Sequence, residues 1–200
     1  VVELDKQRVW HPYTEMTRYR ERVDPFVIEG ASGSRLRDVD GREYLDGNAS
    51  WWTCTLGHGH PRLVAALARQ AETLGHTALA GIAHENAAEL ADALCAVAPP
   101  GLEHVFFSDN GSTAVEVAVK MALQFWLQWR NGAQAQRTRF LAFGEAYHGD
   151  TVGAVSVGGM DLFHARFGPM LFEVERCRSP FGWRAESGGD DQTAEDRAAL

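Results

Sequence analysis

Basic residues are scarce in this sequence of 200 residues, and their scarcity argues against one class of partner. Lysine and arginine together number 19, against 27 aspartates and glutamates, which gives a formal net charge of −8. Nucleic acids and anionic membrane surfaces are bound through clustered positive charge. We therefore expect neither nucleic acid nor a membrane as a partner.

Long apolar runs and paired cysteines are lacking as well. No run approaches the roughly 18 to 20 apolar residues of a membrane span, and residues 1–10 mix charged and apolar residues unlike a secretory signal. Cys54, Cys95 and Cys177 are far apart and form no CxxC pair, so neither a disulfide framework nor a zinc site is expected. This cysteine usage favours a reducing, cytoplasmic location.

The apolar pattern predicts alternating helices and short strands. Asp40-Gly41 indicates the turn of a hairpin over residues 35–45, and Pro61 suits the first turn of a helix. The other expected elements follow in chain order: helices over 61–74 and 85–98, a strand over 104–107, a helix after Gly111, a loop over 131–136, a strand over 138–143, and an acidic surface loop over 185–196. This alternation predicts an α/β fold with a largely parallel sheet.

The stretch FFSDNGSTAVE, residues 106–116, places small and polar residues between an expected strand and an expected helix. The first N–H groups of a helix have no partner within it, and with the helix dipole they can bind a phosphate dianion. Gly111 permits close approach of the backbone, and Ser112 and Thr113 could donate hydroxyl hydrogen bonds. The alternative interpretation is structural: Asp109 or Ser112 caps the helix, and Gly111 only forms a turn.

A second stretch, EAYHGDT over residues 145–151, follows the strand that is expected to end at Phe143. It therefore lies at the carboxyl edge of the sheet, where ligands bind in open α/β folds. An aromatic ring (Tyr147), an imidazole (His148) and a carboxylate (Asp150) would then lie beside the phosphate site. A planar, phosphorylated cofactor would use both stretches. The alternative for His148 is that it only shapes the turn beside Gly149.

Three stretches in this order, DGNASWWTCTLGHGHP, FFSDNGSTAVEVAVKMALQFW and AYHGDT, resemble the class III aminotransferases. The resemblance covers nearly all of residues 8–160, and it implies pyridoxal 5'-phosphate (PLP) as cofactor and fold type I. VWHPYTEM and the Trp51-Trp52 pair are more specific. They resemble the branch in biotin biosynthesis that aminates 8-amino-7-oxononanoate to 7,8-diaminononanoate with S-adenosylmethionine as amino donor.

The resemblance implies roles for particular residues. Gly111 and Ser112 resemble the pair that binds the PLP phosphate, and Tyr147 resembles the aromatic residue at the cofactor ring, where it also borders the substrate. Trp51 resembles the tryptophan of the substrate pocket, and Tyr13 resembles a tyrosine that recognises substrate and donor. Asp150 would support this wall. Residues 79–85, LAGIAHE, resemble the segment that reaches the neighbouring active site in the family's homodimers.

Structural alternatives remain open for several of these residues. Trp51 and Trp52, expected at a strand end, could serve core or interface packing, and at most one of them would face a given pocket. His58 and His60 have the spacing of two metal ligands but lack a third, so capping of the helix after Pro61 is preferred and no metal site is expected. Glu116 is interpreted as structural.

The sequence also lacks the Schiff-base lysine that PLP chemistry requires. Its two lysines are Lys6, before the expected fold, and Lys120, on the order of 10 Å along the helix from Gly111. No catalytic residue is therefore assigned. The resemblance implies an N-terminal half: residues 1–60 as a small-domain segment with a hairpin, and residues 61–200 as the start of the PLP-binding large domain.

Two other functions stay open at this point. A class III aminotransferase for ω-amino acids or ornithine would share the phosphate and YHGDT motifs, but is less expected to share WHPYT and the tryptophan pair. A non-catalytic phosphate-binding or dimerisation module is the second alternative. A comparison of amino donors distinguishes the two aminotransferases, and the coding sequence after Leu200 tests the non-catalytic module, because the missing lysine is expected there.

Overall fold

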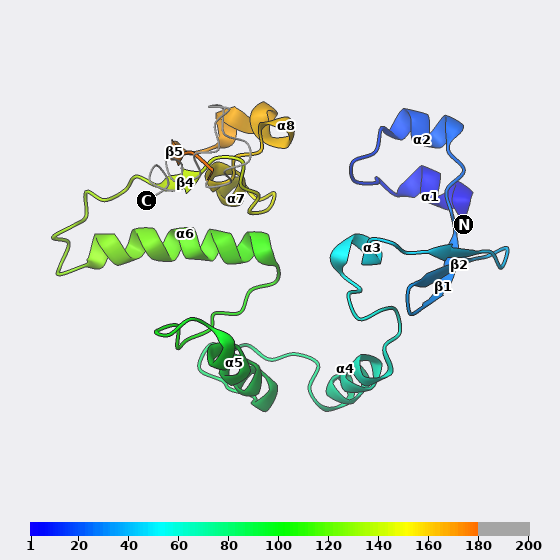
Figure 1. The fold of residues 1–200 in the computed structure, drawn as a ribbon, viewed down its shortest axis with the longest axis horizontal. Helices are drawn as coiled ribbons and strands as arrows, with labels where there is room; N and C mark the ends of the chain where they lie inside the picture. Colours follow the sequence, from blue (N-terminus) through cyan, green and yellow to red (C-terminus); the bar gives the residue numbers. More distant parts are fainter. Residues whose placement is uncertain (180–200) are drawn as a thin grey trace, which may run out of the picture. The chain divides into compact units, whose positions relative to one another are not determined.

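The structure, a computed structural model, describes residues 1–179, and the chain divides into two units, Val1–His84 and Glu85–Leu200. Each unit can be followed separately in Figure 1, the first from blue to green-cyan and the second from green to orange. The division at residue 60 remains a prediction about the domains of a complete protein, and the expected loop at 185–196 lies outside the described residues.

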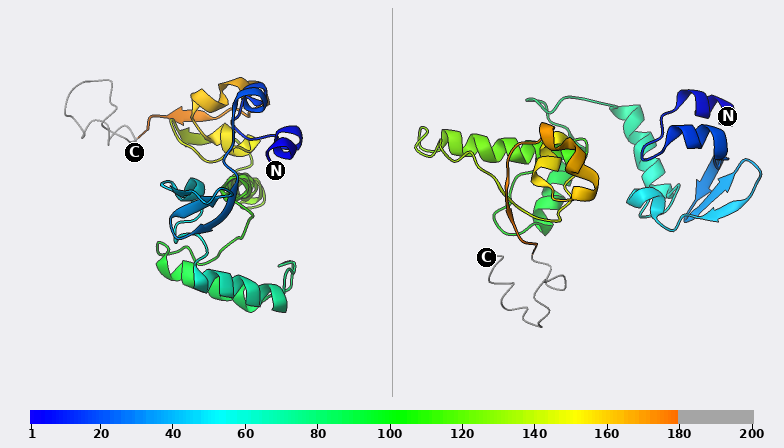
Figure 2. Two further views of the ribbon diagram at one scale, coloured as in Figure 1. Left: turned by 90° about the vertical axis from the view of Figure 1, so that its right-hand side faces the viewer. Right: turned by 90° about the horizontal axis from the view of Figure 1, so that it is seen from above.

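The first unit contains a three-stranded antiparallel sheet with short helices. Its strands, in the order β1-β2-β3, pair side by side, and β1 and β2 are the blue arrows of Figure 2. The elements are α1 (Val2–Arg8), α2 (Met16–Arg22), β1 (Ile28–Ser32), β2 (Arg35–Asp38), β3 (Glu43–Leu45), α3 (Ala49–Trp52) and α4 (Pro61–Thr73). The predicted hairpin over 35–45 is confirmed, and β1 is an additional strand.

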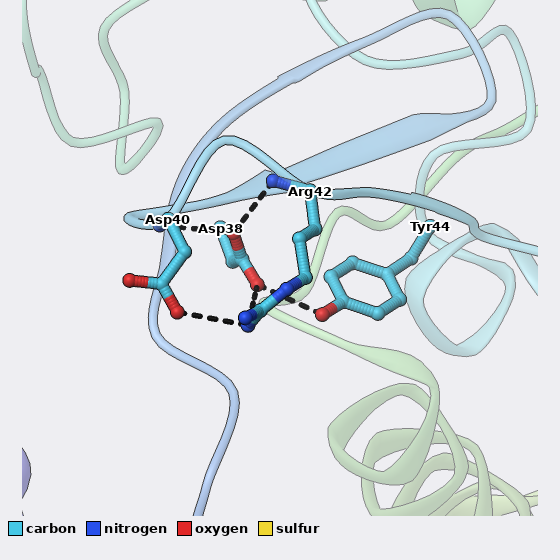
Figure 3. Close-up of polar contacts among 4 residues, drawn as sticks. All are labelled: Asp38, Asp40, Arg42 and Tyr44. Atoms are coloured by element: carbon cyan, nitrogen blue, oxygen red, sulfur yellow. Dashed lines mark hydrogen bonds and ion pairs between the residues drawn. The ribbon is translucent and has the colours of Figure 1, made fainter.

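One carboxylate organises the hairpin turn. Asp38, which is buried, accepts hydrogen bonds from the backbone N–H groups of Asp40 and Arg42 and from the Tyr44 hydroxyl (Figure 3). Burial raises the pKa of Asp38, but these bonds outweigh it and leave the pKa below its ordinary value. Gly41 has a φ of 80°, which a glycine adopts readily. The turn is therefore fixed by the polar contacts of Asp38 as well as by the glycine.

The second unit contains helices and one parallel strand pair. In β4 and β5, Leu141 pairs with Glu175 and Phe143 with Cys177. The elements are α5 (Glu85–Val97), α6 (Gly111–Gln128), β4 (Leu141–Phe143), α7 (Val152–Val157), α8 (Asp161–His164), the 3₁₀ helix η1 (Ala165–Met170) and β5 (Glu175–Cys177). The strand predicted over 104–107 is wrong, since those residues pair with no strand in the described part, and the strand over 138–143 is confirmed only for its last three residues.

Helix boundaries agree with the local signals in the sequence. α4 begins at Pro61 and ends at Thr73, and Leu74 is already extended before Gly75. α5 ends at Val97, two residues before Pro99. Along residues 1–179, no helix combines the length and the apolar character that crossing a bilayer would require.

Few apolar side chains are buried in either unit. Among the described residues the buried hydrophobic ones are Tyr19, Ala154 and Val155, whereas large apolar residues along α4, α5 and α6 are exposed. Within residues 1–179 the β4–β5 pair has no third strand beside it, and a pair of short strands is not stable by itself. The described residues therefore leave these apolar faces exposed to water.

We expect the 200-residue chain alone to be poorly soluble or partly folded, because too little apolar surface is removed from water to offset the entropy of ordering the chain. Differential scanning calorimetry of the isolated chain should show a weak, broad transition. A sharp, cooperative transition in a monomer would contradict this expectation.

Candidate functional site

The N-terminus of α6 is closed by a capping box that leaves its first N–H groups available. Asn110 is the N-cap: its side-chain oxygen accepts from the Thr113 N–H at 3.0 Å, and the Thr113 hydroxyl accepts from the Asn110 N–H at 3.1 Å. The N-cap is therefore Asn110, and neither Asp109 nor Ser112, which the structural alternative named, caps the helix. The N–H groups of Gly111 and Ser112 precede the first helical bond, which joins Ala114 to Asn110, so they are directed out of the helix end.

This helix end opens into a pocket of about 730 Å³. The pocket is lined by Asn110, Gly111, Ser112, Val115, Tyr147, His148, Gly149, Asp150 and Thr151. The two sequence stretches that were expected to meet are thus brought together. A Cβ built on Gly111 would meet no protein atom within 4 Å, which means that the glycine leaves open space at the helix end.

Ser112 holds the second stretch against the helix. The backbone N–H of Asp150 donates to Ser112 Oγ at 3.2 Å, and the hydroxyl, as an acceptor there, still has its own proton to donate. Thr113, which the sequence placed beside Ser112 as a second hydroxyl donor, donates instead to the Asn110 carbonyl at 3.0 Å. Ser112 is therefore the hydroxyl that suits a phosphate oxygen.

Tyr147 is supported by a carboxylate and by a histidine that the sequence reading missed. Its hydroxyl donates to Asp150 Oδ2 at 2.8 Å. His164, buried in α8, lies with its ring nearly parallel to that of Tyr147, 6.4 Å between centroids, and its Nε2 is 3.5 Å from Asp150 Oδ1. No local signal in residues 161–167 identifies this histidine, since the contact spans 17 residues of sequence.

Glu116 joins α6 to α7. Its Oε1 accepts from the Gly153 N–H at 2.6 Å, and Gly153 is buried. The Thr151 hydroxyl, followed by the Gly153 N–H, favours the ionised carboxylate and lowers the pKa of Glu116, although its partial burial opposes this. The carboxylate thereby fixes the segment that follows the pocket-lining residues 147–151.

Trp51 and Tyr13 lie in the first unit, and the structure brings these two predicted residues together. Their rings stack with 5.7 Å between centroids and 28° between planes. Both remain largely exposed, at 63% for Trp51 and 76% for Tyr13. The expected strand end is wrong: α3 is a single turn in which all four residues, from Ala49 (φ 50°) to Trp52 (φ 64°), have positive φ.

Asp46 makes three contacts beside this turn. It accepts from the Ser50 N–H at 2.9 Å, from the Ser50 hydroxyl at 2.8 Å and from His58 Nε2 at 2.8 Å. The predicted capping by histidine is wrong: His60 holds the N-cap position of α4 but makes no capping bond with its side chain, and His58 pairs with Asp46. The Ser50 N–H, then His58 and the Ser50 hydroxyl lower the pKa of Asp46 to about 2.

This depressed pKa predicts a loss of stability in acid. Because the folded pKa lies below the ordinary value of 3.8, Asp46 stabilises the fold above pH 4 and loses that effect as the pH falls through about 2. In the full-length protein, the difference in melting temperature between wild type and Asp46→Asn should shrink from pH 5 to pH 2.5. A difference that is constant over this range would contradict the assignment.

Neither lysine is among the residues that line the pocket. Lys120 is an exposed residue of α6 that lies one turn after Glu116, and Lys6 belongs to α1. Of residues 79–85, expected to reach a neighbouring subunit, the first six form no helix or strand and Glu85 begins α5. The pocket lining therefore supplies the open N-terminus of α6 and an aromatic wall, without a nucleophilic amine.

Comparisons with known proteins agree on one family. The family model described as Aminotransferase class-III matches residues 17–198. The adenosylmethionine-8-amino-7-oxononanoate aminotransferase of Geobacter sulfurreducens is 46% identical over 192 residues, covering 96% of this chain and 42% of that protein. The Nitratidesulfovibrio vulgaris protein of the same name is 48% identical over 181 residues, covering 90% and 33%.

Solved structures give the same fold. The aminotransferase of that name from Methanocaldococcus jannaschii matches with a TM-score of 0.81 and 40% identity, covering 90% of this chain and 40% of that one. An omega transaminase from Pseudomonas jessenii in complex with PMP matches with a TM-score of 0.86 and 29% identity, covering 100% and 44%. The chain thus spans less than half the length of the relatives it matches.

Proposed function

This chain belongs to the class-III aminotransferases, and we propose that the complete protein transfers amino groups with PLP as cofactor. The observation that supports this is the single pocket wall shared by Gly111, Ser112 and Tyr147. PLP, when bound, supplies a carbonyl carbon on which the amino group is carried from donor to acceptor, and a ring that withdraws electrons from that carbon.

The pocket residues suit the two chemically different ends of this cofactor. The N–H groups of Gly111 and Ser112, at the positive end of the α6 dipole, would bind the phosphate, and the Ser112 hydroxyl would donate a further bond. The open space at Gly111 is where a side chain would otherwise compete with the phosphate. Tyr147 would lie at the cofactor ring and border the substrate, with its hydroxyl held by Asp150.

We further propose 8-amino-7-oxononanoate as amino acceptor and S-adenosylmethionine as donor, which yields 7,8-diaminononanoate for biotin biosynthesis. The names of the two bacterial relatives, at 46% and 48% identity, support this choice. The exposed stack of Tyr13 on Trp51 offers an apolar and aromatic surface suited to the substrates. Residues 79–85 would reach the partner's active site in a homodimer, and a cytoplasmic location fits the cysteine usage.

Amino transfer in the purified full-length protein tests this proposal. Product formation from 8-amino-7-oxononanoate should depend on added S-adenosylmethionine and PLP, and mass spectrometry should detect 7,8-diaminononanoate. Lysine in place of S-adenosylmethionine tests the donor separately. Absence of product with either donor, in protein that binds PLP, would remove the biotin-pathway assignment and leave the family assignment intact.

A second candidate is an aminotransferase for ω-amino acids. The structural match to the Pseudomonas jessenii omega transaminase, with a TM-score of 0.86, favours it, whereas its 29% identity is lower than that of the relatives above. A panel of ω-amino acids and ornithine as donors, with pyruvate as acceptor, distinguishes the two. Faster turnover with that panel than with S-adenosylmethionine would support this alternative.

A further inference from the structure

The turn that presents Trp51 is unusually strained for its sequence. Four consecutive residues other than glycine, Ala49 to Trp52, have positive φ, and Ser50 (φ 47°, ψ 56°) and Trp51 (φ 62°, ψ 50°) have left-handed helical geometry. L-residues adopt this geometry at a cost, and rarely in succession. Such strain persists only where the surrounding structure determines it, and it is concentrated at functional positions.

The contacts of Asp46 and Asn48 hold this turn. Asp46 binds both the N–H and the hydroxyl of Ser50, and Asn48 accepts the Trp51 N–H at 3.3 Å on its side chain and the Trp52 N–H at 2.8 Å on its carbonyl. The Asp46 side chain is almost completely buried, with 7% of its surface exposed. A buried carboxylate without its partners is costly, so the turn and the carboxylate stabilise each other.

His58 connects this carboxylate to the sheet. Its ring donates to Asp46, and its backbone forms two hydrogen bonds with Gly33, the residue after β1. Gly57 also lies so close to Gly33 that a Cβ on it would be 3.1 Å from the Gly33 Cα. The sheet therefore determines where His58 and Asp46 lie, and Asp46 determines the turn.

We propose that Asp46 and His58 are positioning residues that hold the left-handed turn, and with it the ring of Trp51 against Tyr13, in the geometry that receives the amino acceptor. The inference rests on the proposed function for the role of this aromatic pair. The pair is mostly exposed, so little packing fixes its orientation. A preset orientation lowers the entropy lost when a flexible substrate binds.

The test compares Asp46→Asn with Asp38→Asn in the full-length protein. Both remove a buried carboxylate with three hydrogen bonds in the same unit, but Asp38 holds the hairpin turn instead of the aromatic turn. Asp46→Asn should raise the KM for 8-amino-7-oxononanoate about tenfold, equivalent to about 1.4 kcal/mol, with a smaller change in kcat. Asp38→Asn should lower the melting temperature and leave that KM unchanged.

Three further variants separate positioning from general destabilisation. Ala49→Gly removes the cost of one left-handed residue. Adding it to Asp46→Asn should therefore reverse part of the rise in KM. His58→Leu should raise the KM as Asp46→Asn does, whereas His58→Gln, which retains a donor, should resemble wild type. These histidine variants decide the matter if Asp46→Asn does not fold.

Chymotrypsin gives a readout that is independent of activity. Cleavage after Trp51 or Trp52, mapped by mass spectrometry, should be about tenfold faster in Asp46→Asn than in Asp38→Asn, because cleavage follows local opening of the turn. If the wild-type protein transfers no amino group to 8-amino-7-oxononanoate, the proposed function is contradicted. The cleavage rates would then still test whether Asp46 holds the turn. Equal KM or equal cleavage in the two Asn variants would overturn the inference.

Discussion

Alanine in place of Gly149 should lower the affinity of the full-length protein for PLP by about 100-fold or more. Two costs act at this position, each of roughly 1–3 kcal/mol. The backbone has a φ of 112°, where side chains other than glycine are strained, and the new Cβ would overlap the Ser112 hydroxyl. Titration of the cofactor-free protein with PLP, followed by fluorescence quenching, measures the loss.

This loss should not be relieved by shortening Ser112. The Gly149 Cβ would also lie 2.7 Å from the Ser112 Cβ and 2.9 Å from its Cα, so Ser112→Ala removes only the hydroxyl overlap. The helix end or the loop must shift instead, and either movement separates the phosphate donors from Tyr147. Unchanged PLP affinity in Gly149→Ala would mean that residues 147–151 do not lie against α6.

Two other glycines provide controls for Gly149→Ala. Gly41→Ala introduces strain at a φ of 80° but meets no atom within 4 Å, and it lies in the hairpin of the other unit. It should lower stability slightly and leave PLP affinity unchanged. Gly111→Ala meets no protein atom, so any loss of affinity there, with an unchanged melting temperature in the cofactor-free protein, reports contact with the phosphate itself.

Elements determined by neighbouring residues could be predicted from the sequence. α4 begins at its proline, which fixes φ, and the 35–45 hairpin turns at Asp40-Gly41, where glycine tolerates the positive φ of the turn. The meeting of Ser112 with the loop at Asp150 was also predictable, since helix starts and strand ends share one edge of an α/β sheet. The resemblance of these motifs to the family then indicated PLP as the phosphorylated cofactor.

Features that depend on distant partners could not be predicted. The stretch 104–107 has the composition of a strand, but a strand forms only with a pairing partner, and none lies in the described residues. The left-handed turn at Trp51 contains no glycine, and its stability comes from Asp46 together with His58, twelve residues apart. His164 lies near Asp150 only in the folded chain, and no sequence motif links the two residues.

Replacing Glu116 with alanine should lower stability by roughly 1–3 kcal/mol, because it leaves the buried Gly153 N–H without its acceptor. The same change frees α7 and the adjoining pocket residues, so PLP affinity should fall with stability. Urea unfolding of the full-length, cofactor-free protein measures the first effect. Lys120→Ala, which removes only a charge one helical turn away, should cost about 0.5 kcal/mol or less.

Glu116→Gln separates the hydrogen bond from the charge. Its amide oxygen can still accept from Gly153, so at neutral pH it should be more stable than the alanine variant. The wild-type carboxyl has a pKa below its ordinary value of 4.5, so it stabilises the fold above that pH and loses this effect as the pH falls through the folded pKa. The difference in unfolding free energy between wild type and Glu116→Gln should therefore decrease on acidification below pH 4.5. If it instead stays constant, the carboxylate charge contributes nothing, and only the shape of the acceptor holds α7 against α6.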